Sequence, residues 1–123
     1  MKKNVLLGGF MALSLYVFAA MPVYAQSKFF SVMPDLPVAD GFVERTDSIL
    51  MFDKPEGRLL DFSAEGHTLL ACQRGLPFYT QTLPYLGWRM DKTGFVREGE
   101  RLEIRLEQVN AALCVLHLSV RPE

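Results

Sequence analysis

The nine residues Arg-Leu-Glu-Ile-Arg-Leu-Glu-Gln-Val, from Arg101 to Val109, decide the fold class of this chain. Apolar and charged side chains alternate along them, with Leu102, Ile104 and Leu106 on one face and Arg101, Glu103, Arg105 and Glu107 on the other. Successive side chains of a strand point to opposite faces of a sheet. The stretch therefore predicts an antiparallel strand with one face in the core and a charged face in water.

The residues on either side of this strand predict hairpins. After a turn at Asn110-Ala111, residues 113–120 alternate again and place Cys114, Leu116, Leu118 and Val120 toward the core. The opposite face carries Leu113, Val115, His117 and Ser119, which is more apolar than contact with water requires. We expect that face either to be a partner or dimer surface or to be covered by the N-terminal arm. Before the central strand, two short strands at 88–90 and 95–97 flank a turn.

The first half of the domain predicts another hairpin and then a helical segment. Residues 48–53 and 58–64 flank the turn Lys54-Pro55-Glu56-Gly57, whose proline and glycine positions suit a type I turn. A short helix is predicted over 68–74, ended by Gly75, and a second helix begins at Pro77. Pro84 predicts a kink or a tightened final turn.

This order of elements, β-β-α-β-β-β, predicts an α+β fold. We expect an antiparallel sheet of four to five strands with one kinked helical segment packed on one face. The strands and the helix account for residues 46–123, a length suited to one compact domain.

The N-terminal residues predict export. Lys2 and Lys3 precede an almost wholly apolar run to Ala20, and Pro22 and a small residue at Ala25 follow. This is the pattern of a signal peptide over residues 1–25, cut after Ala25, and it indicates the periplasm or secretion. Retention as a signal anchor in the inner membrane is the alternative, although the apolar run is short for a span. Residues 26–45 are then an extended, proline-containing N-terminal arm, which packs along its own domain or docks on a partner.

The charge balance excludes one class of partner. The chain has 13 basic and 14 acidic residues, and removing Lys2 and Lys3 leaves 11 basic residues against 14 acidic ones, a net charge of −3. These charges are interspersed. We therefore expect no nucleic-acid partner, because phosphate backbones need clustered Lys and Arg. The part of the chain after the signal contains no second apolar run, so no membrane span is expected there.

Two cysteines, Cys72 and Cys114, are the first candidates for chemistry. A disulfide between them suits a small exported domain, and closing a roughly 40-residue loop would add about 3–4 kcal/mol of stability. Two buried free thiols are the alternative, and reactive or metal-bound thiols are a third. A zinc site would join His67 and His117 to the cysteines, but residues three apart on a strand point to opposite faces. We expect no metal and no cofactor.

Several stretches form a recurring order. They are Met33 to Pro37, Phe52 to Arg58 (with the DKPEGR turn), Phe78 to Trp88 (FY-x2-TLP-x-LGW) and Arg97 to Leu102 (REGERL). In these motifs the chain resembles a family of small exported bacterial proteins without an assigned function. The resemblance implies a compact α+β domain in the periplasm and carries over no catalytic residue.

The sequence shows no convergent catalytic pattern, and a non-enzymatic role is therefore favoured. There is no Gly-x-Ser-x-Gly motif and no glycine-rich phosphate loop. Tyr79, Tyr85 and Trp88 are candidates for a ligand groove, and Leu113, Val115 and His117 for a partner or homodimer surface. The sequence predicts an exported accessory or binding domain. The alternative is a small periplasmic hydrolase that uses His117 or His67 with nearby carboxylates.

Overall fold

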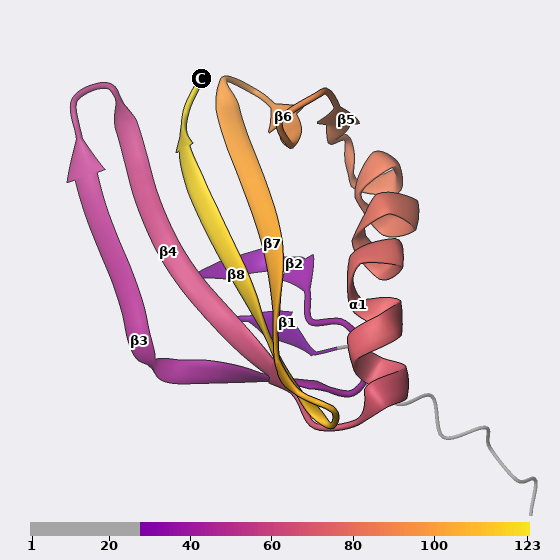
Figure 1. Ribbon diagram of the computed structural model, residues 1–123. Helices are drawn as coiled ribbons and strands as arrows, with labels where there is room; N and C mark the ends of the chain where they lie inside the picture. The colour runs from indigo at the N-terminus through magenta and orange to yellow at the C-terminus, as the bar shows by residue number, and fades with distance from the viewer. Residues whose placement is uncertain (1–27) are drawn as a thin grey trace, which may run out of the picture.

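The computed structural model describes residues 28–123, and the predicted signal peptide and its cleavage site lie outside them (Figure 1). The elements in chain order are β1 (Phe29–Phe30), β2 (Met33–Pro37), β3 (Phe42–Lys54), β4 (Gly57–Gly66), α1 (Leu69–Thr82), the 3₁₀ helix η1 (Leu83–Leu86), β5 (Arg89–Met90), β6 (Phe95–Arg97), β7 (Glu100–Asn110) and β8 (Leu113–Pro122). Neither helix in this part of the chain has the length and apolar composition needed to cross a bilayer.

Most of the strands form one antiparallel sheet. Its order is β3-β4-β8-β7-β6-β5, and β1 and β2 form a separate two-stranded ribbon. The predicted α+β class is confirmed, but the expected four to five strands are too few, because the described residues contain eight strands in two sheets. The extra ribbon lies in the proline-containing arm. Prolines are tolerated there because each strand of a two-stranded ribbon has one edge that needs no amide donor.

The alternation read from residues 101–109 sets the two faces of the sheet. Leu102 is fully buried, and Ile104 and Leu106 pack against the core while the charged residues between them reach solvent. On β8, Cys114, Leu116, Leu118 and Val120 are all buried as predicted. Leu106 lies directly opposite Leu116, and Ile104 opposite Leu118, so the two strands present one continuous apolar face. We call this the core face, and the opposite one the polar face.

The helical segment differs from its prediction in one respect. The break expected at Gly75 is wrong, since α1 runs without interruption from Leu69 to Thr82. A Cβ atom at Gly75 would lie 2.9 Å from the Phe42 ring, so this glycine allows the helix to approach β3 closely and does not end it. The tightened turn predicted at Pro84 is confirmed as η1, which ends at Gly87 in the left-handed conformation.

Residues 28–45 pack along their own domain. Phe30, Met33 and Leu36 are almost completely buried, and the Phe30 ring meets Phe62 of β4 edge-on at 4.9 Å between ring centroids. These residues and α1 share the core face of the sheet, as Figure 1 shows with the β1–β2 ribbon behind the strands and α1 beside it. The arm is therefore part of the hydrophobic core.

The Tyr79 hydroxyl joins α1 to the arm. It donates a hydrogen bond to the carbonyl oxygen of Pro37 at 2.9 Å and accepts one from the amide of Ala39 at 3.2 Å. All three residues are buried. Burial raises the pKa of this tyrosine well above its usual value, so the hydroxyl keeps its proton and donates at every physiological pH.

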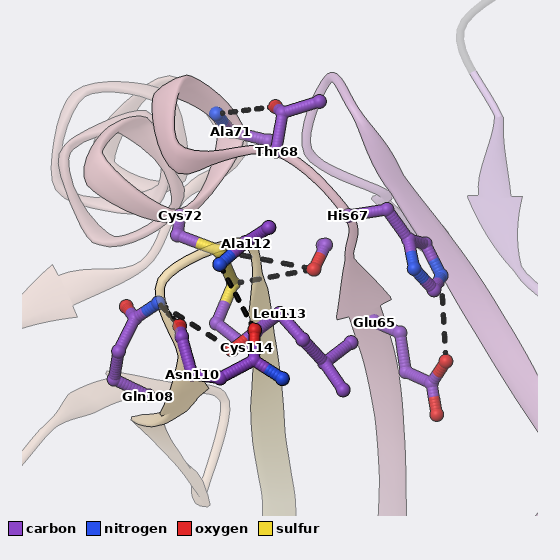
Figure 2. Close-up of a disulfide and its surroundings, with 11 residues drawn as sticks. Glu65, His67, Thr68, Ala71, Cys72, Gln108, Asn110, Ala112, Leu113 and Cys114 are labelled. Carbon is purple, nitrogen blue, oxygen red and sulfur yellow. Dashed lines mark hydrogen bonds and ion pairs between the residues drawn. A yellow bond between two sulfur atoms is a disulfide. The ribbon is translucent and has the colours of Figure 1, made fainter.

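A disulfide between Cys72 and Cys114 ties the first turns of α1 to the start of β8 (Figure 2). The two Cα atoms lie 5.9 Å apart, within the usual range for a bridge. Among the alternatives that the sequence left open, the structure adopts the disulfide. The same close-up shows Thr68 at the helix start, where its Oγ1 accepts a hydrogen bond from the Ala71 amide at 3.0 Å and caps α1.

The first prediction concerns this bridge. The double variant Cys72→Ala/Cys114→Ala should lose about 2–4 kcal/mol of unfolding free energy, because the unfolded chain regains the freedom of the open loop. Urea denaturation followed by the fluorescence of Trp88, the single tryptophan, measures the loss. Adding reductant to the wild type should reproduce the loss and leave the variant unchanged. Equal stability of the wild type and the variant would contradict the prediction.

The second prediction concerns the Tyr79 hydroxyl. Tyr79→Phe should destabilise the domain by about 1–3 kcal/mol, since it leaves the Pro37 carbonyl and the Ala39 amide buried without a partner. Tyr85→Phe is the matched control, because Tyr85 is 92% exposed and should tolerate the change. Urea denaturation of both variants checks this, and equal effects would show that the hydroxyl does not hold the arm.

Candidate functional site

An open trough of about 750 Å³ lies along the sheet. Much of its polar lining comes from the polar face, where Arg105 of β7, His117 of β8, Ser63 of β4 and Arg45 of β3 lie opposite one another in register across four strands. Directly opposed residues of antiparallel strands share a face, so these side chains form one row. Leu76 and Thr80 of α1 and the β5–β6 turn line another part of the trough. The trough therefore presents mixed charge and hydroxyl groups.

Both histidines are paired with carboxylates. His117 Nε2 lies 2.8 Å from Glu107 Oε2 on the neighbouring strand, and His67 Nε2 lies 3.4 Å from Glu65 Oε2. Ser63 stands opposite His117, but its hydroxyl lies 3.2 Å from the Ser48 hydroxyl. Within residues 28–123 no hydroxyl is hydrogen-bonded to either imidazole. The trough thus brings together a histidine and a carboxylate without a nucleophile bonded to them.

The described part of the chain offers few side chains that could bind a metal ion together. It contains no group of three or more His, Cys, Asp and Glu side chains placed to hold one ion. The disulfide uses both cysteine sulfurs, so neither is available as a thiolate ligand. The two histidines contact separate carboxylates, His67 that of Glu65 and His117 that of Glu107.

The residues that the sequence marked as a groove or partner surface do not share one surface. Tyr79, Trp88 and Val115 are buried at 1%, 2% and 7% exposure, whereas Tyr85 is exposed and Leu113 and His117 are half-buried. The Arg97 guanidinium covers the Trp88 ring at 4.4 Å from its centroid, and it also bonds Asp35 of β2 and the Leu86 carbonyl. Tyr79 and Trp88 therefore belong to the core, with the Tyr79 hydroxyl bonded to the arm and the Trp88 ring covered by Arg97 of β6.

The outer half of β3 presents a surface that the sequence interpretation missed. β3 is the first strand in the sheet order, so among the described residues one of its edges has no strand partner. Leu50, Met51 and Phe52 are exposed at 54%, 61% and 57%. We call Ile49 to Asp53 the free edge. The signal was present in the sequence, since residues 49–52 are apolar without alternation, which a strand with one solvated face does not need.

A bend in β3 sets the free edge apart from the body of the sheet. The pairing with β4 shifts between Arg45, opposite Ser63, and Leu50, opposite Asp61, so several residues of β3 bulge against few of β4. Bulges bend a strand and increase its twist. Figure 1 shows β3 turning sharply at this point, with the outer β3–β4 hairpin at one margin of the sheet and far from α1. Neither α1 nor the β1–β2 ribbon lies against it in this view.

Asp91 organises the turn that borders the trough. Its carboxylate accepts hydrogen bonds from the amides of Thr93 and Gly94 at 3.0 and 3.1 Å and from both terminal nitrogens of Arg101 at 2.8 Å. The hydrogen bonds from Arg101, followed by the one from the Thr93 amide, hold the pKa of this carboxyl well below its usual range.

Comparisons with protein-family models, with curated proteins and with solved structures found no match.

The third prediction follows from Asp91. Its folded-state pKa lies below that of the unfolded chain, so its ionised form contributes stability above about pH 4, and the contribution is lost as the pH falls toward the folded value. Asp91→Asn should therefore be less stable than the wild type at pH 7, and the difference should shrink on acidification. Urea denaturation at a series of pH values measures it.

Asp40→Asn is the matched control for this series. Asp40 is exposed, and within residues 28–123 its side chain makes no ion pair or hydrogen bond. The control variant should follow the wild type throughout. A stability difference between Asp91→Asn and the wild type that stays constant down to pH 2 would rule out the proposed contribution of the charge.

Proposed function

We propose that this chain is an exported, non-enzymatic binding domain that engages a protein through the free edge of β3. The observation that carries the proposal is a strand edge that has no partner among residues 28–123 and carries three consecutive apolar side chains, each more than half exposed. The signal-like N-terminus supports the exported location, and so does the Cys72–Cys114 bridge, because disulfides persist in oxidising compartments.

Strand addition is the mode of binding that suits this edge. An extended segment of a partner can pair with the backbone of an edge strand, and the hydrogen bonds of the ladder supply affinity while alternate side chains supply specificity. Leu50 lies opposite Asp61 and Met51 opposite Leu60 in the β3–β4 register, so the exposed apolar side chains lie on both faces of the sheet. A partner strand would therefore bury apolar surface on both sides.

The features that normally prevent pairing at an edge strand lie at the two ends of the free edge and not within it. Natural edge strands are protected by bulges, lysines and prolines. In β3 the bulge precedes Leu50, and Lys54 and Pro55 follow Asp53. The residues between them keep regular pairing with β4 and carry no positive charge. This arrangement limits pairing to a short segment and still leaves that segment open.

A hydrolase is the second candidate, favoured by the His117–Glu107 pair beside the trough. It requires an imidazole that acts as a base, so His117→Ala with His67→Ala should abolish the function of the protein in cells. The binding function predicts instead that the double variant keeps the wild-type phenotype. Scoring that phenotype separates the two candidates.

The fourth prediction tests the binding function in cells. A photo-crosslinking amino acid at Phe52 should give adducts of defined mass in the exported protein, and the Leu50→Lys change in the same chain should remove them, because a charge on this edge opposes pairing. The same probe at Val109, 52% exposed on β7, is the control and should give no such adduct. Identical adduct patterns at the two positions, or none at either, would overturn the proposal.

A further inference from the structure

We infer that the partner on the free edge is a second copy of this chain, paired antiparallel through β3 about a two-fold axis at Met51. This inference rests on the proposed function, since it names the occupant of the same edge. Two six-stranded sheets would then continue as one across the dimer.

The sequence of the edge is complementary to itself in one register. A two-fold axis normal to the sheet pairs a strand with its own copy about one central residue. Centring on Met51 places Met51 opposite itself, Leu50 opposite Phe52 and Ile49 opposite Asp53. Apolar side chains thus meet apolar ones at the middle, and no two like charges lie directly opposite each other.

The two neighbouring registers place less favourable pairs of side chains opposite each other. Centring on Leu50 places Met51 opposite Ile49 and Phe52 opposite Ser48, and both of these partners lie in the stretch between Arg45 and Leu50 where β3 leaves its regular pairing. Centring on Phe52 places Met51 opposite Asp53 and Leu50 opposite Lys54, so each strand has two charged groups opposite apolar side chains, against one in the Met51 register. Regular pairing and apolar matching therefore select the Met51 register.

The Met51 register also buries apolar surface on both faces. Leu50 and Phe52 share the polar face with Asp61, whereas Met51 shares the core face with Leu60. In the dimer the Leu50 and Phe52 side chains of both copies form one cluster, and the two Met51 side chains meet on the other face. Aromatic and aliphatic cross-strand pairs of this kind are the unit of sheet stabilisation.

The interface is small, which sets the expected affinity. The free edge has five residues, whereas a standard interface uses about 20–30 residues on each side. We therefore expect a weak and reversible dimer with a Kd on the order of 10–100 µM. Such a dimer forms at high local concentration and leaves the edge accessible at low concentration.

The fifth prediction tests both the partner and the register with an added thiol. The chain's two native cysteines are bonded to each other, so Met51→Cys supplies the only free thiol. Directly opposed residues of antiparallel strands have Cα atoms about 4.5–5.5 Å apart, within the range of a disulfide. Under mild oxidation Met51→Cys should form a covalent dimer at least about tenfold faster than Val43→Cys, whose native side chain on β3 before the bulge is similarly exposed, at 58% against 61%. A mixture of Leu50→Cys and Phe52→Cys should give mainly the mixed dimer.

Sedimentation equilibrium provides a measurement that does not depend on cysteine variants. The wild-type chain should shift from monomer to dimer between about 1 and 500 µM, as a Kd in the expected range requires. Phe52→Lys should stay monomeric, and Val43→Lys should behave as the wild type. Circular dichroism of the two lysine variants confirms that both are folded.

The outcomes separate this inference from the proposed function. A wild type that stays monomeric, with Met51→Cys dimerising no faster than Val43→Cys, overturns the second copy as the partner. If the crosslinker at position 52 then still gives adducts with another protein, the binding function stands and the partner is different. If it gives none, both proposals fail. Dimerisation with preferential crosslinking at Val43→Cys overturns the register and the free edge together.

Discussion

The covalent bond between Cys72 and Cys114 fixes where α1 lies on the sheet, and the other packing follows from that position. Both sulfurs lie 3.8 Å from the Gly66 carbonyl oxygen, and since disulfide sulfurs carry no hydrogen these are packing contacts. A Cβ at Gly66 would approach Cys114 Sγ to 2.8 Å and the Phe42 ring to 2.9 Å. The strand β4 therefore needs a glycine at the point where helix, β3 and β8 meet. A larger residue at position 66 would collide with both the disulfide and the Phe42 ring.

With α1 in that position, the rest of the core face needs a second segment to cover it. The β1–β2 ribbon is this segment, and Tyr79 and Arg97 join that ribbon to α1 and to β6. This cover ends before the outer β3–β4 hairpin, where the pairing shift bends the strand away. On the polar face Val115 and Ser63 are buried, and the in-register row of charged and hydroxyl groups lines the trough. Within residues 28–123 this packing buries the core and leaves the free edge of β3 exposed.

The elements that could be predicted from the sequence are those marked by alternation of apolar and polar residues and by the positions of proline and glycine. Strict alternation around Ile104 gave β7, its partner β8 and the identity of the core face, and Pro84 with Gly87 gave the helix end. The continuity of α1 through Gly75 depends on the ring of Phe42, 33 positions earlier in the numbering, and no local pattern reports such an approach. The burial of Tyr79 likewise depends on the distant backbone of Pro37 and Ala39. The apolar run at 49–52 is visible in the sequence, but its place at an edge of the sheet depends on the strand order, which one strand does not encode.

Packing within residues 28–123 does not explain why the free edge is apolar. Leu50, Met51 and Phe52 are each more than half exposed, so threonine or charged residues there would cost the monomer little of its burial free energy. Exposed apolar strands carry a risk of aggregation that natural sequences reduce with charges on the edge. Here the bulge, Lys54 and Pro55 confine the risk to a few residues and leave those residues apolar. The partner strand that we propose would bury them and would supply stabilisation that the described fold alone does not provide.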